Sequence, residues 1–195
     1  MKPIGNLVNH KLLVRENKPV AFSEKTLEKV KQLIRRYPEG QARSAILPVL
    51  HIAQEELGGY LTVDIMDYVA SLLGLLPIQV YEVATFYSMF FMEKVGKYVI
   101  EVCQTGPCMI SGNDELLGYL EEKLGVKRGE TSADGLFTLR TVECLGACGY
   151  APVMQVNTIF HEHLDRVKID RIIDELRKKS EETQHGEETW AEGFC

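Results

Sequence analysis

Cys103-Gln-Thr-Gly-Pro-Cys108 and Cys144-Leu-Gly-Ala-Cys148 contain four of the five cysteines of this 195-residue chain. Four residues separate the cysteines of the first pair, three separate those of the second, and 35 residues lie between the pairs. Glycine and proline stand in or beside both pairs. Such residues let a backbone turn sharply and approach a bound group closely. The two stretches therefore indicate turning segments that present their thiols to a shared site.

Four thiolates from two loops can hold one metal centre, and iron–sulfur clusters are bound by four cysteines in this way. Residues 97–103 have the composition of a strand, and a helical stretch covers residues 111–124, so Cys108 is expected near a helix start. The positive end of a helix and its free N–H groups favour negative charge there. The surrounding sequence therefore favours an anionic cluster. Its expected ligands are Cys103, Cys108, Cys144 and Cys148.

Other interpretations of these cysteines stay open. Structural zinc also takes four cysteines, although its two pairs are often closer together in the sequence. Two disulfides are less expected, because no export signal is present and disulfides are rare in cytosolic proteins. A thioredoxin-type dithiol needs Cys-x-x-Cys, which neither pair has. Buried cysteines without a ligand would not explain why the cysteines are paired beside glycine and proline.

The cysteine pairs belong to longer stretches that resemble a known family. Glu143-Cys-Leu-Gly-Ala-Cys-Gly-Tyr-Ala-Pro-Val-Met-Gln-Val-Asn157 and, upstream, Val80-Tyr-Glu-Val-Ala-Thr-Phe-Tyr-Ser-Met89 are similar to the NuoE-type thioredoxin-like [2Fe–2S] subunit of NADH:quinone oxidoreductase, respiratory complex I. The similarity runs from about residue 22 to about residue 178. Related subunits serve NAD-linked hydrogenases and formate dehydrogenases, so the resemblance identifies the family more firmly than the particular complex.

The resemblance implies an electron-transfer subunit that carries one [2Fe–2S] cluster on the four cysteines, with no complete active site on this chain alone. It also implies a partner subunit that binds FMN and NADH, and further subunits of a peripheral arm. Because the chain has no Gly-x-Gly-x-x-Gly motif, we do not expect it to bind NAD itself. The alternatives are the equivalent subunit of an NAD-linked hydrogenase or formate dehydrogenase, and a zinc-stabilised scaffold module.

The composition narrows the choice of partners and location. Hydrophobic residues make up 45% of the chain and charged residues 26%, with a formal net charge of -6. An acidic balance without a basic block argues against a nucleic-acid partner. No stretch approaches the roughly 18 consecutive apolar residues of a membrane span, and residues 1–10 lack the apolar core of an export signal. We expect a location in a peripheral arm on the cytoplasmic side of a bacterial inner membrane, rather than in the mitochondrial matrix.

Hydrophobic periodicity divides the chain into four parts, and the predicted class is α+β. Residues 1–22 are expected to form an N-terminal arm, 23–94 a helical domain, 95–180 a thioredoxin-like [2Fe–2S] domain and 181–195 an acidic mobile tail. An N-terminal helical bundle thus precedes an α/β ferredoxin domain. The pattern alone predicts the order strand, helix, three strands, helix for that domain, and the resemblance supplies the thioredoxin-like topology.

The expected elements follow from the same patterns. In the first half, helices are predicted at residues 23–37, 42–57, 63–73 and 77–91, the second one bent at Pro48 because a proline ring removes a backbone hydrogen bond. In the second half, strands are predicted at 98–102, 136–142, 153–156 and 159–163, and helices at 114–124 and 169–179. His51 is interpreted as a structural residue, His161 and His163 as one solvated hairpin face, and Cys195 as a free thiol outside the cluster.

Overall fold

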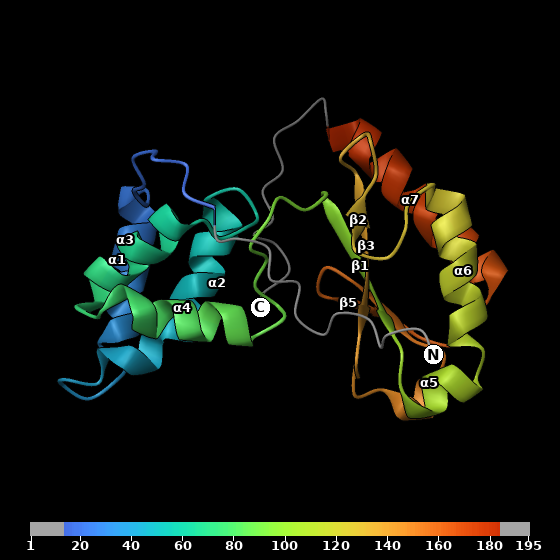
Figure 1. Ribbon diagram of the computed structural model, residues 1–195, viewed down its shortest axis with the longest axis horizontal. Coiled ribbons are helices and arrows are strands. Elements are labelled where there is room, and N and C mark those ends of the chain that lie inside the picture. The colour runs from blue at the N-terminus through green and yellow to red at the C-terminus, as the bar shows by residue number, and fades with distance from the viewer. Residues whose placement is uncertain (1–13, 184–195) are drawn as a thin grey trace. The chain divides into compact units, whose positions relative to one another are not determined.

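The computed structural model describes residues 14–183, and the chain divides between Lys94 and Val95 into a helical unit and a unit built on a sheet (Figure 1). The predicted α+β class is confirmed. Residues 1–13 of the expected arm and residues 184–195 of the expected tail, Cys195 included, lie outside the described residues. Of the helices described, none combines the length and the apolar character needed to cross a membrane.

The described part of the first unit contains four α-helices and one short 3-10 helix. They are α1 (Glu24–Ile34), η1 (Ala42–Ala45), α2 (Ile46–Glu56), α3 (Val63–Leu73) and α4 (Pro77–Phe86). Local side chains determine several of the helix ends. The Ser23 hydroxyl accepts the N–H of Thr26 and begins α1, the Thr62 hydroxyl accepts the N–H of Ile65 and begins α3, and Gly74 ends α3 in the left-handed conformation.

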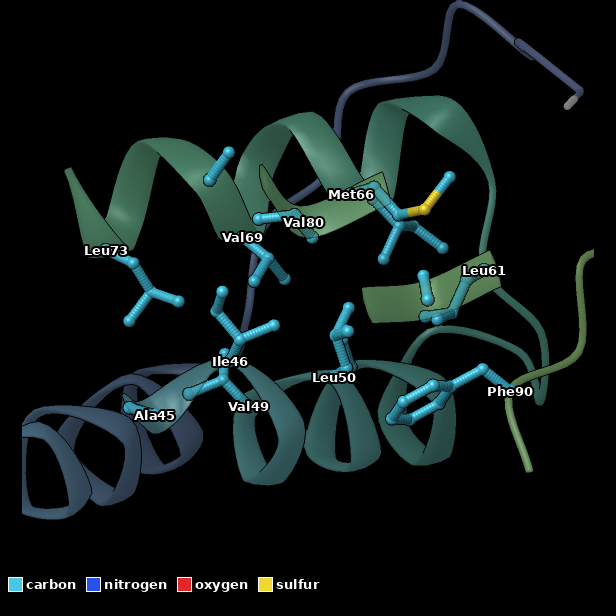
Figure 2. Close-up of a cluster of buried hydrophobic side chains, with 14 of the residues drawn as sticks. Ala45, Ile46, Val49, Leu50, Leu61, Met66, Val69, Leu73, Val80 and Phe90 are labelled. Carbon is cyan, nitrogen blue, oxygen red and sulfur yellow. The ribbon is translucent and has the colours of Figure 1, made fainter. Parts of the chain in front are cut away.

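The inward faces of these helices share one hydrophobic core (Figure 2). In this view Ile46, Val49 and Leu50 point from α2 toward Met66 and Val69 of α3. Fully burying a side chain of this size stabilises a fold by about 1.5–3 kcal/mol. Helices of 10 or 11 residues are marginal on their own in water. The shared core therefore stabilises them more than their intrinsic propensity does.

The single helix predicted over residues 42–57, with a bend at Pro48, is not what the structure shows. The segment is divided into η1 and α2, and because α2 begins at Ile46, Pro48 lies in its first turn. The N–H groups of a first turn have no acceptor within the helix, so the missing N–H of proline costs no hydrogen bond there.

The fourth helix ends at Phe86 rather than near Phe91 as predicted. The side chain of Gln54 provides the hydrogen bonds that a longer helix would have made. Its oxygen accepts the N–H of Phe91 at 2.8 Å, and its nitrogen donates to the carbonyl of Met89 at 3.1 Å. The backbone can therefore leave the helix, while Phe90 still reaches the core and is only 5% exposed.

The described part of the expected arm, residues 14–22, packs along α3 of its own chain. Arg15 forms ion pairs with Asp64 at 3.2 Å and with Asp67 at 2.7 Å. The N–H of Glu16 also donates to Asp64, at 2.7 Å. Asp64 lies in the first turn of α3, where the helix dipole favours a negative charge. Polar contacts thus hold this stretch against α3.

The second unit, as far as it is described, is a five-stranded sheet in the order β2-β3-β1-β4-β5, with α6 and α7 on one face (Figure 1). The strands are β1 (Tyr98–Cys103), β2 (Glu130–Thr131), β3 (Phe137–Val142), β4 (Met154–Val156) and β5 (Ile159–His161). The helical segments are α5 (Gly106–Ile110), α6 (Asn113–Leu124), η2 (Cys148–Tyr150) and α7 (Arg166–Thr183). The short elements β2 and α5 were not predicted, and α7 extends into the expected tail.

Strand β1 lies at the centre of the sheet. It pairs in parallel with β3, with Tyr98 opposite Phe137 and Cys103 opposite Val142, and it pairs antiparallel with β4. One face of the sheet packs with α6 and α7 in a second hydrophobic core. The most deeply buried members of that core are Ile100, Leu120, Leu139, Met154, Ile169 and Ile173. Because the pairing of β1 and β3 is parallel, both strands end at the same edge of the sheet.

The two histidines of the predicted hairpin face do not lie on one strand, so that prediction was wrong. β5 ends at His161, and His163 lies beyond it with a φ of 46°. The ring of His163 instead contacts that of Tyr150, with a centroid distance of 5.7 Å. In the helical unit, the ring of His51 contacts that of Phe90 at 5.0 Å.

Two glycines of the sheet unit give a matched test of the packing. A Cβ at Gly96 would lie 2.9 Å from backbone atoms of Leu136 and Phe137, which cannot move without disturbing β3. Gly118 is exposed within α6, and a Cβ there meets nothing within 4 Å. We expect Gly96→Ala to lower the free energy of unfolding by about 1–3 kcal/mol. Gly118→Ala should raise it by about 0.5–1 kcal/mol.

Urea unfolding of the two variants and the parent chain measures both effects. Equal stability of Gly96→Ala and the parent chain would contradict the close approach of residue 96 to β3.

Candidate metal centre

The parallel pairing of β1 and β3 brings the two cysteine pairs to one edge of the sheet. Cys103 is the last residue of β1 and lies opposite Val142, the last residue of β3, and Cys144 follows two positions later. The hydroxyl of Thr105 donates to the carbonyl of Glu143, which joins the loop after β1 to the loop after β3. Two segments that are far apart in sequence thus become neighbours because their strands run in the same direction.

The first cysteine pair is buried. After β1 the chain turns at Gly106, whose φ of 47° is readily available to glycine, and enters the short helix α5. Cys108 lies within α5, and Cys103 and Cys108 are each only 2% exposed. Their thiols are joined by a hydrogen bond and pack with Val153 in a small hydrophobic cluster. The inner side of the site is therefore shielded from water.

The second cysteine pair is exposed. The loop turns at Gly146, which has a φ of 73°, and the N–H of Gly146 donates to the sulfur of Cys144 at 3.3 Å. Cys148 is the first residue of η2, and η2 contacts α5. The sulfurs of Cys148 and Cys108 are close enough for their charges to interact. The four predicted site residues thus lie on two adjoining loops, two of them buried and two open to solvent.

Backbone N–H groups donate to both buried sulfurs and lower the pKa of each, but the net pKa shifts of the two thiols are opposite. Burial raises the pKa of Cys103. The N–H groups of Thr105 and Leu145 and the thiol of Cys108 together lower this pKa by more than burial raises it, so it lies below its ordinary value. For Cys108, burial and the neighbouring sulfur of Cys103 raise the pKa, although the N–H of Val153 opposes them. The surroundings of Cys103 therefore favour its thiolate more than those of Cys108 do.

The donor set fits an anionic two-iron cluster. Such a cluster takes four thiolates in all, two at each iron, and N–H groups on the sulfurs stabilise its negative charge. Here four thiols lie on two adjoining loops, and three of them accept backbone N–H groups. Among residues 14–183, no three His, Cys, Asp or Glu side chains, these cysteines included, lie in an arrangement that could hold a metal ion, so the fit rests on the chemistry of the donors.

Asn113 is a residue of this site that the sequence analysis missed. It is 1% exposed, and its side-chain nitrogen donates to the carbonyls of Cys103 and, at 3.2 Å, of Val153. These acceptors are 10 and 40 residues away in the sequence. An asparagine beside a glycine at a helix start indicates the helix start alone. Only the folded chain identifies the carbonyls to which it donates.

Exposed apolar side chains lie on α5 and η2, the two helical segments that carry Cys108 and Cys148 and that contact each other. Met109 and Ile110 at the end of α5 are 53% and 90% exposed, and Tyr150 at the end of η2 is 52% exposed. An apolar side chain that is 90% exposed contributes nothing to the core of this chain. These three residues, called here the apolar rim, are therefore available to another protein.

The comparisons with known proteins agree on one family. The profile described as "Thioredoxin-like [2Fe-2S] ferredoxin" matches residues 30–177. The E subunit of the NADH-quinone oxidoreductase of Rickettsia conorii is 48% identical over 156 residues, which cover 80% of this chain and 93% of the relative. The mitochondrial "NADH dehydrogenase [ubiquinone] flavoprotein 2" of Dictyostelium discoideum is 39% identical over 174 residues, covering 89% of this chain and 70% of the relative.

A solved structure shares the fold. It is the crystal structure of an NAD+-reducing [NiFe]-hydrogenase in the H2-reduced state, which matches with a TM-score of 0.61 and 22% identity. The match covers 69% of this chain and 23% of the hydrogenase chain. At this identity the likeness concerns the fold alone.

The difference in burial predicts different reactivities of the thiols. In the metal-free chain, we expect iodoacetamide to alkylate Cys144 and Cys148 at least about tenfold faster than Cys103 and Cys108, because access as well as thiolate content limits the reaction. Peptide mass spectrometry after timed quenching measures each rate. In urea the four rates should converge, and equal rates in the folded chain would contradict the burial of the first pair.

Proposed function

The chain belongs to the thioredoxin-like [2Fe–2S] ferredoxin family, and from this premise we propose that it is the [2Fe–2S] electron-transfer subunit of an NADH:quinone oxidoreductase, respiratory complex I. The observation that carries the proposal is the 48% identity with the Rickettsia conorii relative, 93% of whose length is covered. The edge of the sheet supports it with the required chemistry, since four thiols on two adjoining loops accept backbone N–H groups. The chain would act as part of an oxidoreductase whose active site other subunits complete.

We assign the cluster ligands to Cys103, Cys108, Cys144 and Cys148. When bound, a [2Fe–2S] cluster accepts and returns one electron at a time. Cys103 and Cys108 would hold its inner side, where Val153 excludes water. The N–H groups that already donate to these sulfurs would stabilise the thiolates and help to set the reduction potential.

The exposed side of the site is where we expect electrons to enter and leave. Cys144 and Cys148 face solvent, and the apolar rim of Met109, Ile110 and Tyr150 lies on α5 and η2, the second of which begins at Cys148. A partner that covered the rim would come close to the outer sulfurs and exclude water from the path between the two redox groups. The proposed partner is the subunit that binds FMN and NADH, within a peripheral arm on the cytoplasmic side of a bacterial inner membrane.

Two alternatives to a complex I subunit are compared with the proposal by sequence identity and by spectroscopy. The equivalent subunit of an NAD-linked hydrogenase would share this fold, and the hydrogenase structure is similar to the chain at 22% identity, well below the 48% of the Rickettsia conorii relative. A zinc-stabilised scaffold would use the same cysteines without electron transfer. Zinc is colourless and diamagnetic, so spectroscopy distinguishes it from a cluster.

The ligand assignment predicts a paramagnetic signal that depends on Cys144. The purified chain should be silent in electron paramagnetic resonance as isolated, and dithionite should produce the spin-half signal of one reduced [2Fe–2S] cluster. Cys144→Ala should lose the signal together with bound iron and sulfide, whereas Cys195→Ala should keep all three. Full iron and sulfide in Cys144→Ala would refute the assignment of this ligand, and zinc with silence in both states would favour the scaffold.

If the apolar rim contacts the partner, a change in the rim should weaken binding of the FMN-binding subunit while the chain still binds its cluster. Ile110→Glu places a charge where an apolar contact is expected, so we expect affinity for the FMN-binding subunit to fall about tenfold or more. Val167→Glu, a change at a residue 77% exposed in the first turn of α7, is the matched control. Titration calorimetry of the two loaded variants compares them, and equal affinities would exclude Ile110 from the interface.

A further inference from the structure

Asn113 connects the two segments that carry the inner half of the site. Its side-chain nitrogen donates to the carbonyl of Cys103, the last residue of β1, and to the carbonyl of Val153, just before β4. The same Val153 carbonyl accepts the N–H of Cys103 at 3.3 Å. The N–H of Val153 in turn donates to the sulfur of Cys108. One amide therefore holds in place the backbone of one ligand and the N–H donor of another.

The oxygen of the same amide indicates why asparagine stands here. Oδ1 of Asn113 is buried and accepts no hydrogen bond within the described part of the chain. A buried acceptor without a partner is unfavourable, and an apolar side chain of similar size would avoid that cost. The two hydrogen bonds made by the nitrogen must therefore provide the advantage of asparagine at this position.

The position of Asn113 in α6 gives it a rigid support. It is the first residue of α6, whose Leu117 and Leu120 are buried in the core against the sheet. A side chain supported in this way keeps its nitrogen at a fixed place relative to β1 and β4. Such contacts outside the ligand set orient metal ligands and tune the bound metal.

We propose that Asn113 is a positioning residue of the cluster site, which fixes the spacing between Cys103 and the Val153 N–H that donates to Cys108. The inference rests on the proposed function, because it concerns a cluster held by these cysteines. Without the amide, the carbonyls of Cys103 and Val153 lose a shared donor, and the hydrogen bond from the Cys103 N–H to the Val153 carbonyl has to join the two segments with less support. The ligands would then hold the cluster less firmly and in a different hydrogen-bonded environment.

The test compares two changes in the same helix. Asn113→Leu removes both hydrogen bonds at similar volume, whereas Leu120→Ala destabilises α6 from a fully buried position and leaves both hydrogen bonds in place. Each variant is loaded with its cluster and held at the same interval below its own unfolding midpoint. The readouts are the rate of iron release to a chelator and the g-values of the dithionite-reduced chain.

We expect iron release to be about tenfold faster in Asn113→Leu than in the parent chain, with shifted g-values. Leu120→Ala should keep the parental spectrum and release iron less than about twofold faster. Asn113→Ser keeps one hydroxyl donor and should lie between them, and it carries the comparison if the leucine variant does not fold. Identical release rates and spectra in the Asn113 variants and Leu120→Ala would overturn the inference. A parent chain that binds no iron and sulfide would instead overturn the proposed function.

Discussion

The parallel pairing of β1 with β3 is the interaction on which the candidate site depends. Cys103 ends β1 opposite Val142, and Cys144 follows soon after the end of β3, so the two cysteine pairs meet at one edge. An antiparallel arrangement of the same strands would place their C-terminal ends at opposite edges. The intervening segment can span the sheet because it contains α6, which packs across one face and returns the chain to the start of β3.

The site built at this edge has two unlike halves. The inner thiols of Cys103 and Cys108 are buried and accept backbone N–H groups. The side chain of Asn113 donates to the backbone carbonyl of Cys103. The outer thiols of Cys144 and Cys148 are exposed beside an apolar surface. This asymmetry suits a centre that must be held firmly by its own chain and approached closely by a partner. Firm support limits rearrangement on reduction, and exposure shortens the distance that an electron must cross.

Local signals in the sequence predicted the beginnings of helices better than their ends. Ser23 and Thr62 begin α1 and α3 as expected, because a capping hydroxyl and its N–H partner are three residues apart. The end of α4 was placed too late, because Gln54 supplies hydrogen bonds from another helix to the chain beyond Phe86. Pro48 was misjudged because its effect depends on whether it stands in the first turn or the middle of a helix.

The sequence by itself predicted the α+β class and the four candidate ligands, because hydrophobic periodicity and the spacing of the cysteine pairs are short-range features that can be read directly. Only the tertiary structure decided that Cys103 and Cys108 are buried while Cys144 and Cys148 are exposed, and that Asn113 joins two ligand segments. These features arise from strand pairing and packing between residues that are far apart in sequence. The physical reason is that the residues next to an asparagine in the sequence do not indicate a hydrogen-bond partner that lies 40 residues away.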